Sequence, residues 1–247
     1  MSKSTLIGVL LSLICLSGCH SQSDGTINIA VATNFYLTAQ ALETEFEHRS
    51  GYEVRLISGS TGQLYAQIKN GAPHHIFLSA DQDRALRLVQ DKLAKDRVTY
   101  AIGRLVLWGP KHKEVNFETL KGEDFQHLAI ANPSLAPYGL AAQDVISDLG
   151  ISDKIVMGEN IGQVYSLIKT GNAELGFIAR GQLKATQSPS GTIWPVPASL
   201  HRPIIQDAVI IKTEFESSGA KAFYTFLKSD RARDIIQSAG YDLPNAK

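Results

Sequence analysis

The sequence has few cysteines, and none in its main body. The two that it has, Cys15 and Cys19, stand within the first 19 of 247 residues. The body that follows residue 25 therefore has no cysteine with which to form a disulfide. A chain of this length can bury a large hydrophobic core without covalent cross-links, so an oxidising compartment is still compatible with the sequence. The body is long enough for two domains.

An excess of charge of either sign is also missing. Lys and Arg together number 24, as do Asp and Glu, which gives a formal net charge of zero. Residues 1–18 contain one charged side chain, Lys3, so the remainder of the chain carries a formal charge of −1. A nucleic-acid partner would require a basic surface. The balance of charge therefore argues against nucleic-acid binding.

Long apolar runs are missing as well. The run Leu6–Leu16, which follows a single lysine, is too short to span a bilayer and is typical of an export signal. It ends in Leu16-Ser17-Gly18-Cys19, which resembles the lipobox of bacterial lipoprotein signals. We predict a signal peptide over residues 1–18, lipid attachment at Cys19 and a tether over residues 19–26, with an ordinary signal peptide as the alternative. The protein would then be periplasmic or on the cell surface, held to a membrane by its lipid.

From residue 27 onward, short apolar runs alternate with amphipathic stretches, which is the pattern of an α/β sheet covered by helices. For example, Phe35, Ala39, Leu42 and Phe46 recur at spacings that place them on one helical face, and Gly51 follows as a terminator. We predict a first series with strands at 27–32, 52–57 and 75–79 and with helices after each of them, the second at 60–70 and the third at 81–93.

Two apolar runs, at 98–108 and 203–212, are longer than ordinary strands, and we predict that they cross between two lobes. A second series between them has strands at 127–132 and 175–179 and helices at 138–149 and 162–170. The Ser-, Pro- and Gly-rich segment 187–200 is predicted to be a loop, and helices at 217–227 and 231–239 close the chain. The prediction is an α/β protein with lobe I at 27–104 and 207–247, lobe II at 105–206, and a cleft between them.

Four predicted strand-to-helix junctions carry small hydroxyl, amide or glycine residues. They are Ala32-Thr33-Asn34, Ser58-Gly59-Ser60-Thr61-Gly62, Ala136-Pro137-Tyr138-Gly139 and Asn160-Ile161-Gly162. The first backbone N–H groups of a helix lack partners within it and favour anions. In an open α/β sheet, ligands bind beyond the carboxyl ends of the strands, where all four junctions would lie. The pattern predicts an anion site without Lys or Arg, the alternative being that these residues only cap their helices.

The same junctions carry a resemblance to a known family, the molybdate-binding proteins of bacterial ABC transporters. The similarity covers residues 27–243, and its motifs are specific in combination. They are Ala30-Val31-Ala32-Thr33-Asn34-Phe35, Ser58-Gly59-Ser60-Thr61-Gly62-Gln63-Leu64-Tyr65-Ala66-Gln67-Ile68, Asn70-Gly71-Ala72-Pro73, Phe77-Leu78-Ser79-Ala80-Asp81, Asn132-Pro133, Ala136-Pro137-Tyr138-Gly139, Leu175-Gly176-Phe177 and Ala239-Gly240-Tyr241.

The resemblance implies a two-lobed periplasmic-binding fold of type II that closes over molybdate or tungstate and passes it to ABC permease subunits. It implies a monomer with no cofactor and no metal other than that of the oxyanion. The implied ligand contacts are Thr33, Asn34, Thr61, and the backbones of Tyr138 and Ile161. Some members place a ligand-contacting Tyr where this chain has Ala179 or Arg180. The chain instead resembles the subgroup with a Thr-Asn-Phe start and a Pro-Tyr-Gly loop, which does without that Tyr.

A site made of donors alone fits an unprotonated dianion. The remaining O–H of phosphate would face a donor and leave a buried polar group unmatched, at a cost of roughly 1–3 kcal/mol. Sulfate and molybdate are both dianions, so cavity size must separate them. The sequence does not give cavity size, and a sulfate-like oxyanion is therefore the alternative ligand.

Other chemistries have weaker support in the sequence. His74 and His75 are adjacent, and neighbours in a strand point to opposite faces, so the pair cannot easily chelate one metal ion. Arg180 is expected near the cleft, either assisting the anion or paired with a carboxylate. The chain has no Gly-x-Ser-x-Gly elbow, and Gly59-Ser60-Thr61-Gly62 lacks the Lys of a phosphate-binding Walker loop. We predict that the protein is not an enzyme.

Overall fold

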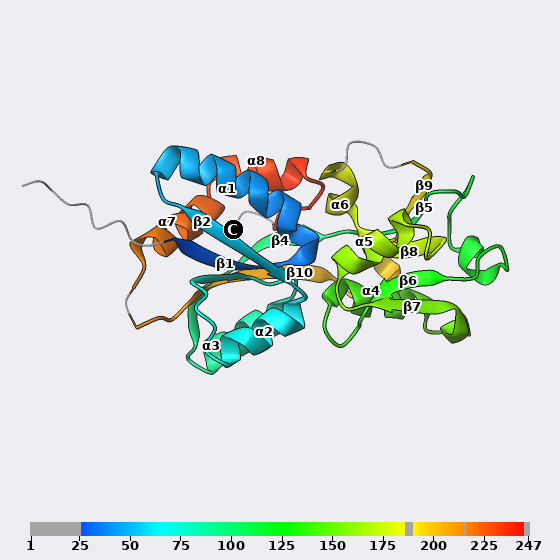
Figure 1. The fold of residues 1–247 in the computed structure, drawn as a ribbon, viewed down its shortest axis with the longest axis horizontal. Coiled ribbons are helices and arrows are strands. Elements are labelled where there is room, and N and C mark those ends of the chain that lie inside the picture. Colours follow the sequence, from blue (N-terminus) through cyan, green and yellow to red (C-terminus); the bar gives the residue numbers. More distant parts are fainter. Residues whose placement is uncertain (1–25, 186–189, 215, 245–247) are drawn as a thin grey trace, which may run out of the picture.

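The computed structural model describes residues 26–185, 190–214 and 216–244. The predicted signal peptide, Cys19 and the tether as far as residue 25 lie outside the described residues. The described chain forms two lobes that lie side by side, each built around its own five-stranded sheet (Figure 1). In this part of the chain, no helix combines the length and the apolar character that crossing a membrane requires.

The first lobe is a sheet with helices on both faces (Figure 1). Its strand order is β2-β1-β3-β10-β4, in which β1 runs parallel to β2 and β3 while β10 runs antiparallel to β3 and β4. The strands are β1 (Ile27–Ala32), β2 (Val54–Gly59), β3 (Ile76–Leu78), β4 (Ala94–Gly103) and β10 (Ile204–Ile211). The helices are α1 (Tyr36–Ser50), α2 (Thr61–Lys69), α3 (Gln82–Gln90), α7 (Ser218–Leu227) and α8 (Asp230–Ser238), and a 3₁₀ turn, Thr33–Phe35, precedes α1.

The second lobe has the strand order β7-β6-β8-β5-β9. Strand β6 is parallel to β7 and β8, and β5 is antiparallel to β8 and β9. The strands are β5 (Leu105–Gly109), β6 (Leu128–Ala131), β7 (Ile155–Gly158), β8 (Leu175–Ala179) and β9 (Thr192–Pro195). The helices are α4 (Pro137–Ile146), α5 (Ile161–Lys169) and α6 (Arg180–Ala185), with 3₁₀ turns at Glu118–Lys121, Ser152–Lys154 and Ala198–Leu200.

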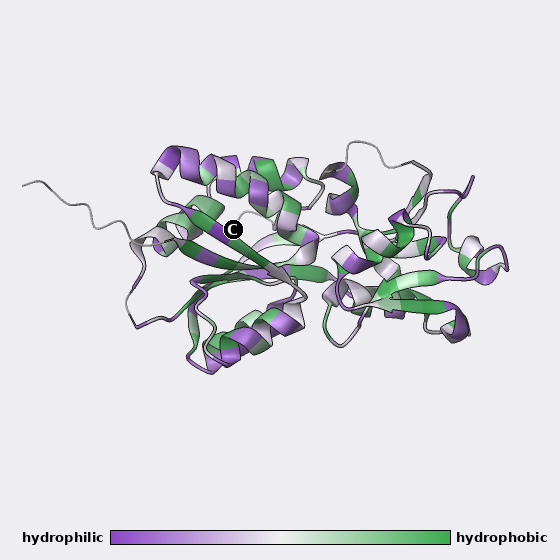
Figure 2. Ribbon diagram, in the orientation of Figure 1, coloured by the Kyte–Doolittle hydropathy of each residue, from purple (hydrophilic) through white to green (hydrophobic). Residues whose placement is uncertain are grey.

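Side-chain alternation explains why helices cover both faces of the first sheet. In β1, Ile29 and Val31 pack into the cluster that includes residues of α1, α7 and α8. Ala30 points the other way, into the cluster formed with α2 and α3, because successive strand residues face opposite sides. The strands are accordingly apolar and the helices are polar on their outer faces (Figure 2). The second lobe has a separate hydrophobic core.

The first helix follows the sequence prediction closely. Phe35, Ala39, Leu42 and Phe46 are all buried, as expected for one face of an amphipathic helix. The helix ends at Gly51, which has a φ of 73°. This left-handed conformation is accessible to glycine at little cost, which explains why the helix stops here.

Four parts of the fold differ from the predicted elements. The run 98–108 is not one strand, because β4 ends at Gly103 in the first sheet and β5 begins at Leu105 in the second. The predicted loop 187–200 contains β9, which pairs with β5. Strand β7 and helix α6 were not predicted, since both are short and β7 carries only partial burial. The run 203–212 lies in the first sheet as β10.

Two connections therefore join the sheets. One is Arg104, between β4 and β5, and the other is the segment 201–203, which precedes β10. The two connections lie together, because Ile204 at the start of β10 pairs with Gly103 at the end of β4. Any movement of one lobe relative to the other must bend the chain at this pair.

Candidate anion-binding site

The four predicted junctions meet at one small cavity between the lobes. Thr33, Asn34 and Thr61 reach it from the first lobe, and Tyr138 and Ile161 reach it from the second. The structure thus brings together all five residues proposed from the sequence. The other lining residues are Ala32, Ser60, Ala80, Ala136, Pro137 and Asn160. None of these side chains is ionisable apart from the Tyr138 phenol, so any ligand of this cavity meets uncharged groups.

At the start of α2, all but one of the first-turn N–H groups have partners among the described residues. The Ser60 side chain accepts from the N–H of Gln63 in a capping box, and the Ser60 carbonyl accepts from that of Leu64. The N–H of Gly62 donates across the cleft to the Leu135 carbonyl at 2.8 Å. The remaining N–H is that of Thr61, which lines the cavity.

The helices of the second lobe repeat this arrangement. At α5, the Asn160 side chain accepts from the N–H groups of Gly162 and Gln163, and its carbonyl accepts from Val164, which leaves the N–H of Ile161. At α4, Pro137 has no N–H, and the next two donors after Tyr138 both bond to the Ala136 carbonyl. The N–H of Tyr138 is left. Among the described residues, three helix starts thus each keep one backbone N–H without a partner at the cavity, where helix dipoles favour an anion.

The two threonine hydroxyls are not equivalent. Thr61 is 2% exposed, and its hydroxyl oxygen accepts a long hydrogen bond of 3.4 Å from the Ala80 N–H, so its hydrogen is still available to a ligand. The Thr33 hydroxyl already donates to the Gly59 carbonyl at 2.9 Å and contacts the Ser58 hydroxyl at 3.3 Å. The Thr61 hydroxyl therefore keeps a hydrogen to donate, whereas the Thr33 hydroxyl joins the ends of β1 and β2.

The Asn34 side chain is also committed within the first lobe. Its amide nitrogen donates to Gln206 Oε1 at 2.9 Å and to the Tyr241 hydroxyl at 3.4 Å. Tyr241 in turn donates to the Asn34 carbonyl at 2.5 Å. Gln206 is fully buried and was not foreseen, because a glutamine within an apolar strand gives no sequence signal of its partners. Tyr241 belongs to the Ala-Gly-Tyr motif but received no role. Both residues position Asn34 from behind the cavity.

The lobes are in contact around the cavity. Besides the bond from Gly62, the Gln63 side chain donates to Glu159 at 3.0 Å, and Arg84 donates to the Ser134 carbonyl at 2.7 Å. A Cβ placed on Gly162 would lie 2.6 Å from Thr33 Cγ2, which is closer than real Cβ contacts. The structure is therefore a closed arrangement of the two lobes.

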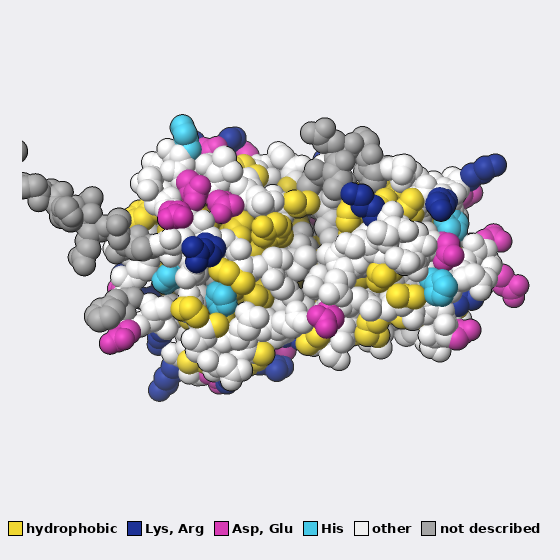
Figure 3. All heavy atoms as spheres, in the orientation of Figure 1, with side chains coloured by type: hydrophobic (Ala, Val, Ile, Leu, Met, Phe, Trp, Pro, Cys, Tyr) yellow, Lys and Arg dark blue, Asp and Glu magenta, His cyan; other side chains and the backbone are white. Residues whose placement is uncertain are grey.

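In this closed arrangement the cavity is small, at about 10 Å³. That is close to the minimum volume that holds one ordered water. A larger groove of about 500 Å³ adjoins it and shares Ala80 and Pro137 with it. Arg84, Arg87 and Arg202 line this groove with Asp81 and Asp83. Elsewhere, charges of both signs are scattered over the face shown in Figure 3.

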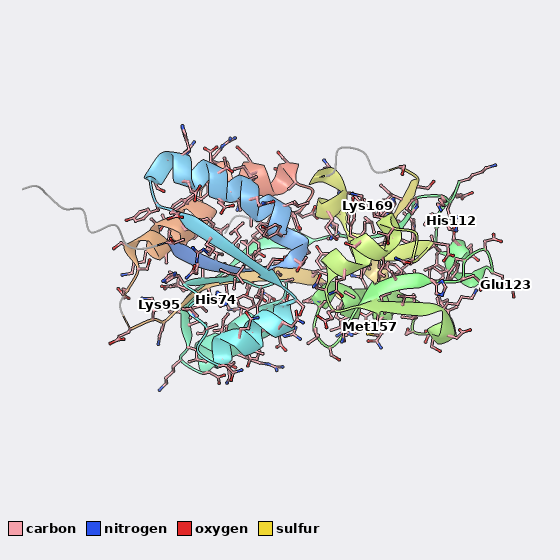
Figure 4. All side chains as sticks on the ribbon, viewed as in Figure 1. His74, Lys95, His112, Glu123, Met157 and Lys169 are labelled. Carbon is pink, nitrogen blue, oxygen red and sulfur yellow. The ribbon has the colours of Figure 1, made fainter. Side chains whose placement is uncertain are left out.

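The remaining candidate residues lie outside the cavity. His74 is buried within the first lobe, away from the second (Figure 4), and burial is the main cause that lowers its pKa. His75 Nδ1 accepts from the Asn28 N–H at 2.9 Å. Arg180 donates its backbone N–H to the Arg104 carbonyl and neither lines the cavity nor, among the described residues, forms an ion pair. The described residues contain no group of three potential metal-ligating side chains.

Two lobes joined by two adjacent connections, with an anion-type cavity between them, define a solute-binding protein of the two-lobed class. The chain belongs to the family of bacterial extracellular solute-binding proteins, which matches residues 27–242. It is 40% identical to the molybdate-binding protein ModA of Azotobacter vinelandii over 92% of this chain and 94% of that protein.

A solved structure and a further relative agree with this assignment. The structure of the periplasmic molybdate-binding protein of Azotobacter vinelandii superimposes with a TM-score of 0.84 at 40% identity, over 89% of this chain and all of that one. A protein of Bacillus subtilis named as a putative ABC transporter substrate-binding lipoprotein, YvgL, is 28% identical over 96% of this chain and 97% of that protein. The type II binding-protein fold predicted from the sequence is thereby confirmed, and these relatives are solute-binding proteins rather than enzymes.

Proposed function

We propose that the protein captures molybdate or tungstate outside the cytoplasm, in the cavity between its lobes, and delivers it as a monomer to the permease subunits of an ABC transporter. The observation that carries the proposal is the set of three single N–H donors, from Thr61, Tyr138 and Ile161, that face one cavity lined without charged side chains. The 40% identity to a molybdate-binding protein supports the choice of anion.

Each proposed contact has a distinct role. The Thr61 N–H and hydroxyl donate from the first lobe, and the N–H groups of Tyr138 and Ile161 donate from the second. Thr33 and Asn34 line the cavity at the first junction, and their side chains are held in place by hydrogen bonds within the first lobe. Because donors from both lobes are needed, the anion itself stabilises the closed arrangement.

A donor-only cavity disfavours protonated anions. The O–H of hydrogen phosphate would face an N–H or a hydroxyl hydrogen, and the unmatched pair would cost about 1–3 kcal/mol. Sulfate carries the same charge as molybdate and no proton, so the cavity must separate the two by size. A binding protein for sulfate is therefore the second candidate function.

Thermal unfolding of the full-length chain in detergent tests the proposal. At a ligand concentration one hundred times its dissociation constant, molybdate should stabilise the folded state by about 2.7 kcal/mol. Tungstate should do the same, while phosphate at equal concentration should leave Tm unchanged. Stabilisation by sulfate alone would transfer the assignment to the second candidate, and no response to any of the four anions would remove the proposed function.

We further propose that the two lobes move as bodies, with lobe I at 27–104 and 204–244 and lobe II at 105–203. The second boundary lies three residues before the predicted one at 206/207, because β10 begins at Ile204 in the first sheet. The two sheets and their separate cores support this division. Hinge closure around a ligand is common in proteins of this architecture. Small-angle scattering with and without molybdate should give different radii of gyration, and identical curves would count against closure.

The N-terminus is proposed to anchor the protein through lipid on Cys19, with residues 1–18 removed as a signal peptide. The motif Leu16-Ser17-Gly18-Cys19 supports this, as does the name of the Bacillus subtilis relative, a lipoprotein. Several acyl chains on one cysteine would hold the protein firmly, because each buried CH₂ contributes about 0.8 kcal/mol. Replacing Cys19 by Ala should move the protein from the membrane fraction to the soluble fraction, and an unchanged distribution would indicate an ordinary signal peptide.

A further inference from the structure

Tyr138 extends from the anion cavity to the place where the lobes are connected. Its backbone belongs to the cavity lining, while its ring is 1% exposed. A Cβ placed on Gly103 would lie 2.2 Å from the Tyr138 hydroxyl and 2.9 Å from Cζ of the same ring. The end of the ring therefore rests on the backbone of Gly103, which has no side chain to keep it away.

Gly103 is the last residue of β4 and pairs with Ile204, the first residue of β10. Ile204 is part of the same contact, because its Cγ2 would lie 3.0 Å from a Cβ on Gly103. The Tyr138 phenol, which belongs to α4 of the second lobe, is thus packed against Gly103 and Ile204, the residues that border the two connections between the lobes. A rotation of the lobes about these connections moves the ring relative to Gly103.

The Tyr138 hydroxyl makes this contact without a hydrogen bond. Within the described part of the chain, this buried oxygen has no hydrogen-bond partner within 3.5 Å. Burial raises the pKa of Tyr138 well above its usual value, and hydrogen-bonding groups of the Asn34 side chain and the Arg104 backbone near the phenol lower it only in part. The phenol is therefore neutral, and in the closed arrangement its hydroxyl exchanges hydration for these contacts, none of which is a hydrogen bond of normal length.

We propose that Tyr138 is a positioning residue that couples anion capture to lobe closure, a role that rests on the function proposed above and deepens it. The backbone N–H of Tyr138 binds the anion, while the ring of the same residue packs against Gly103 and Ile204 at the β4–β10 pair. A shift of α4 toward the anion therefore also changes the packing at this pair. Gly103 is the second residue that this coupling requires, because only a residue without a side chain leaves room for the phenol when the lobes close.

Three variants test the coupling by calorimetric titration with molybdate. Gly103→Ala should weaken binding at least tenfold, because its methyl group occupies the position of the phenol in the closed arrangement. Tyr138→Phe keeps the backbone donor and removes the hydroxyl that is buried without a partner, so it should tighten binding about fivefold. In the double variant the shortest contact lengthens from 2.2 to 2.9 Å, and at least tenfold of the lost affinity should return.

Gly122→Ala is the matched control, because a Cβ at Gly122 meets nothing closer than 3.5 Å and its φ of −79° suits any residue. It should bind as the wild type does. Wild-type affinity for Gly103→Ala would overturn the proposal, and so would a double variant no better than Gly103→Ala. A loss of more than tenfold in Tyr138→Phe would also overturn it, since the hydroxyl would then form a bond that matters.

Small-angle scattering without ligand separates this proposal from the proposed function. Gly103→Ala should have a larger radius of gyration than the wild type, and the double variant should return toward the wild-type value, whether or not molybdate is the cargo. Equal radii for all variants would contradict the coupling even if molybdate binds. If Gly103→Ala does not fold, recovery of folding in the double variant supports the contact. If neither variant folds, the affinity of Tyr138→Phe for molybdate decides: tighter binding supports the proposal, and a loss of more than tenfold overturns it.

Discussion

Replacing Thr61 and Thr33 separately by valine distinguishes a ligand donor from a structural hydroxyl. Valine keeps the branched shape and removes only the hydroxyl function. The Thr61 hydroxyl accepts from the Ala80 N–H at 3.4 Å and keeps its hydrogen for the cavity, whereas the Thr33 hydroxyl donates to the Gly59 carbonyl at 2.9 Å. The two threonines line the same cavity, so each is the matched control for the other.

The expected magnitudes differ in kind. A hydrogen bond to a charged group contributes about 1.5–3 kcal/mol, so Thr61→Val should weaken molybdate binding roughly 10- to 150-fold. Thr33→Val removes a neutral hydrogen bond within the first lobe and should cost about 0.5–1.5 kcal/mol of stability. Its affinity for molybdate should stay within about threefold of the wild type, since the lost bond exists with or without the anion.

Isothermal titration calorimetry gives the affinities, and urea unfolding without ligand gives the stabilities. The reasoning predicts a crossed result, with Thr61→Val impaired mainly in binding and Thr33→Val mainly in stability. Equal losses of affinity in the two variants would refute the assignment of the donor. A larger loss of affinity in Thr33→Val would show that its hydroxyl leaves Gly59 for the anion.

The other predictions concern a contact between the lobes and an ion pair at one of the two connections. Gly62→Ala would place a Cβ 3.1 Å from Leu135 Cα across the cleft. We expect calorimetry to show that molybdate binds more weakly by about 1 kcal/mol, because the lobes can no longer approach as closely. Unchanged affinity would mean that the lobes do not close this far. Arg202 holds the pKa of Asp144 below its ordinary value of 3.8, so this pair stabilises the protein above that pH and ceases to do so as the pH falls through the lowered pKa. Asp144→Asn should therefore reduce the free energy of unfolding by about 0.2–1 kcal/mol at pH 7 and leave it unchanged well below pH 3.8. Thermal unfolding at a series of pH values measures this. A difference in Tm between variant and wild type that stays constant with pH would show that the pairing is absent.

Apolar periodicity predicted the elements that are long or fully buried. Strand β8, over Leu175–Ala179, matches its predicted bounds, because five buried residues between polar neighbours leave few alternatives. Strand β9 was missed because three of its four residues are only partly buried and the fourth is exposed, and because it lies between Ser-, Gly- and Pro-rich neighbours that suggested a loop. Its pairing with β5 is a long-range contact, which local pattern cannot supply.

The long run 98–108 illustrates a different limit. Apolar residues stand on both sides of Gly103 and Arg104, where the chain leaves one sheet and enters the other. The apolar pattern indicates that the backbone is extended and buried, but it does not indicate to which sheet each part of the run belongs. The crossing was therefore predicted, while the break between β4 and β5 was not.

The candidate site shows the same division. The helix-start residues were recognisable because Ser60 and Asn160 cap helices by local rules, and the donor that each cap leaves over follows from helix geometry. The partners of Asn34 and Thr33 were not recognisable. Gln206 lies 172 positions from Asn34 in the sequence, and only the folded chain shows that Thr33 donates to Gly59 rather than into the cavity.

A crystal structure of the molybdate complex, with the metal located by anomalous scattering at the molybdenum edge, tests the central claim most directly. The metal should lie between the lobes, with its oxygens about 2.7–3.2 Å from the backbone nitrogens of Thr61, Tyr138 and Ile161. The Thr61 hydroxyl should face one of the same oxygens. A molybdenum position outside this cavity, or contacts that omit these three nitrogens, would contradict the claim that donors left over at helix starts form the binding site.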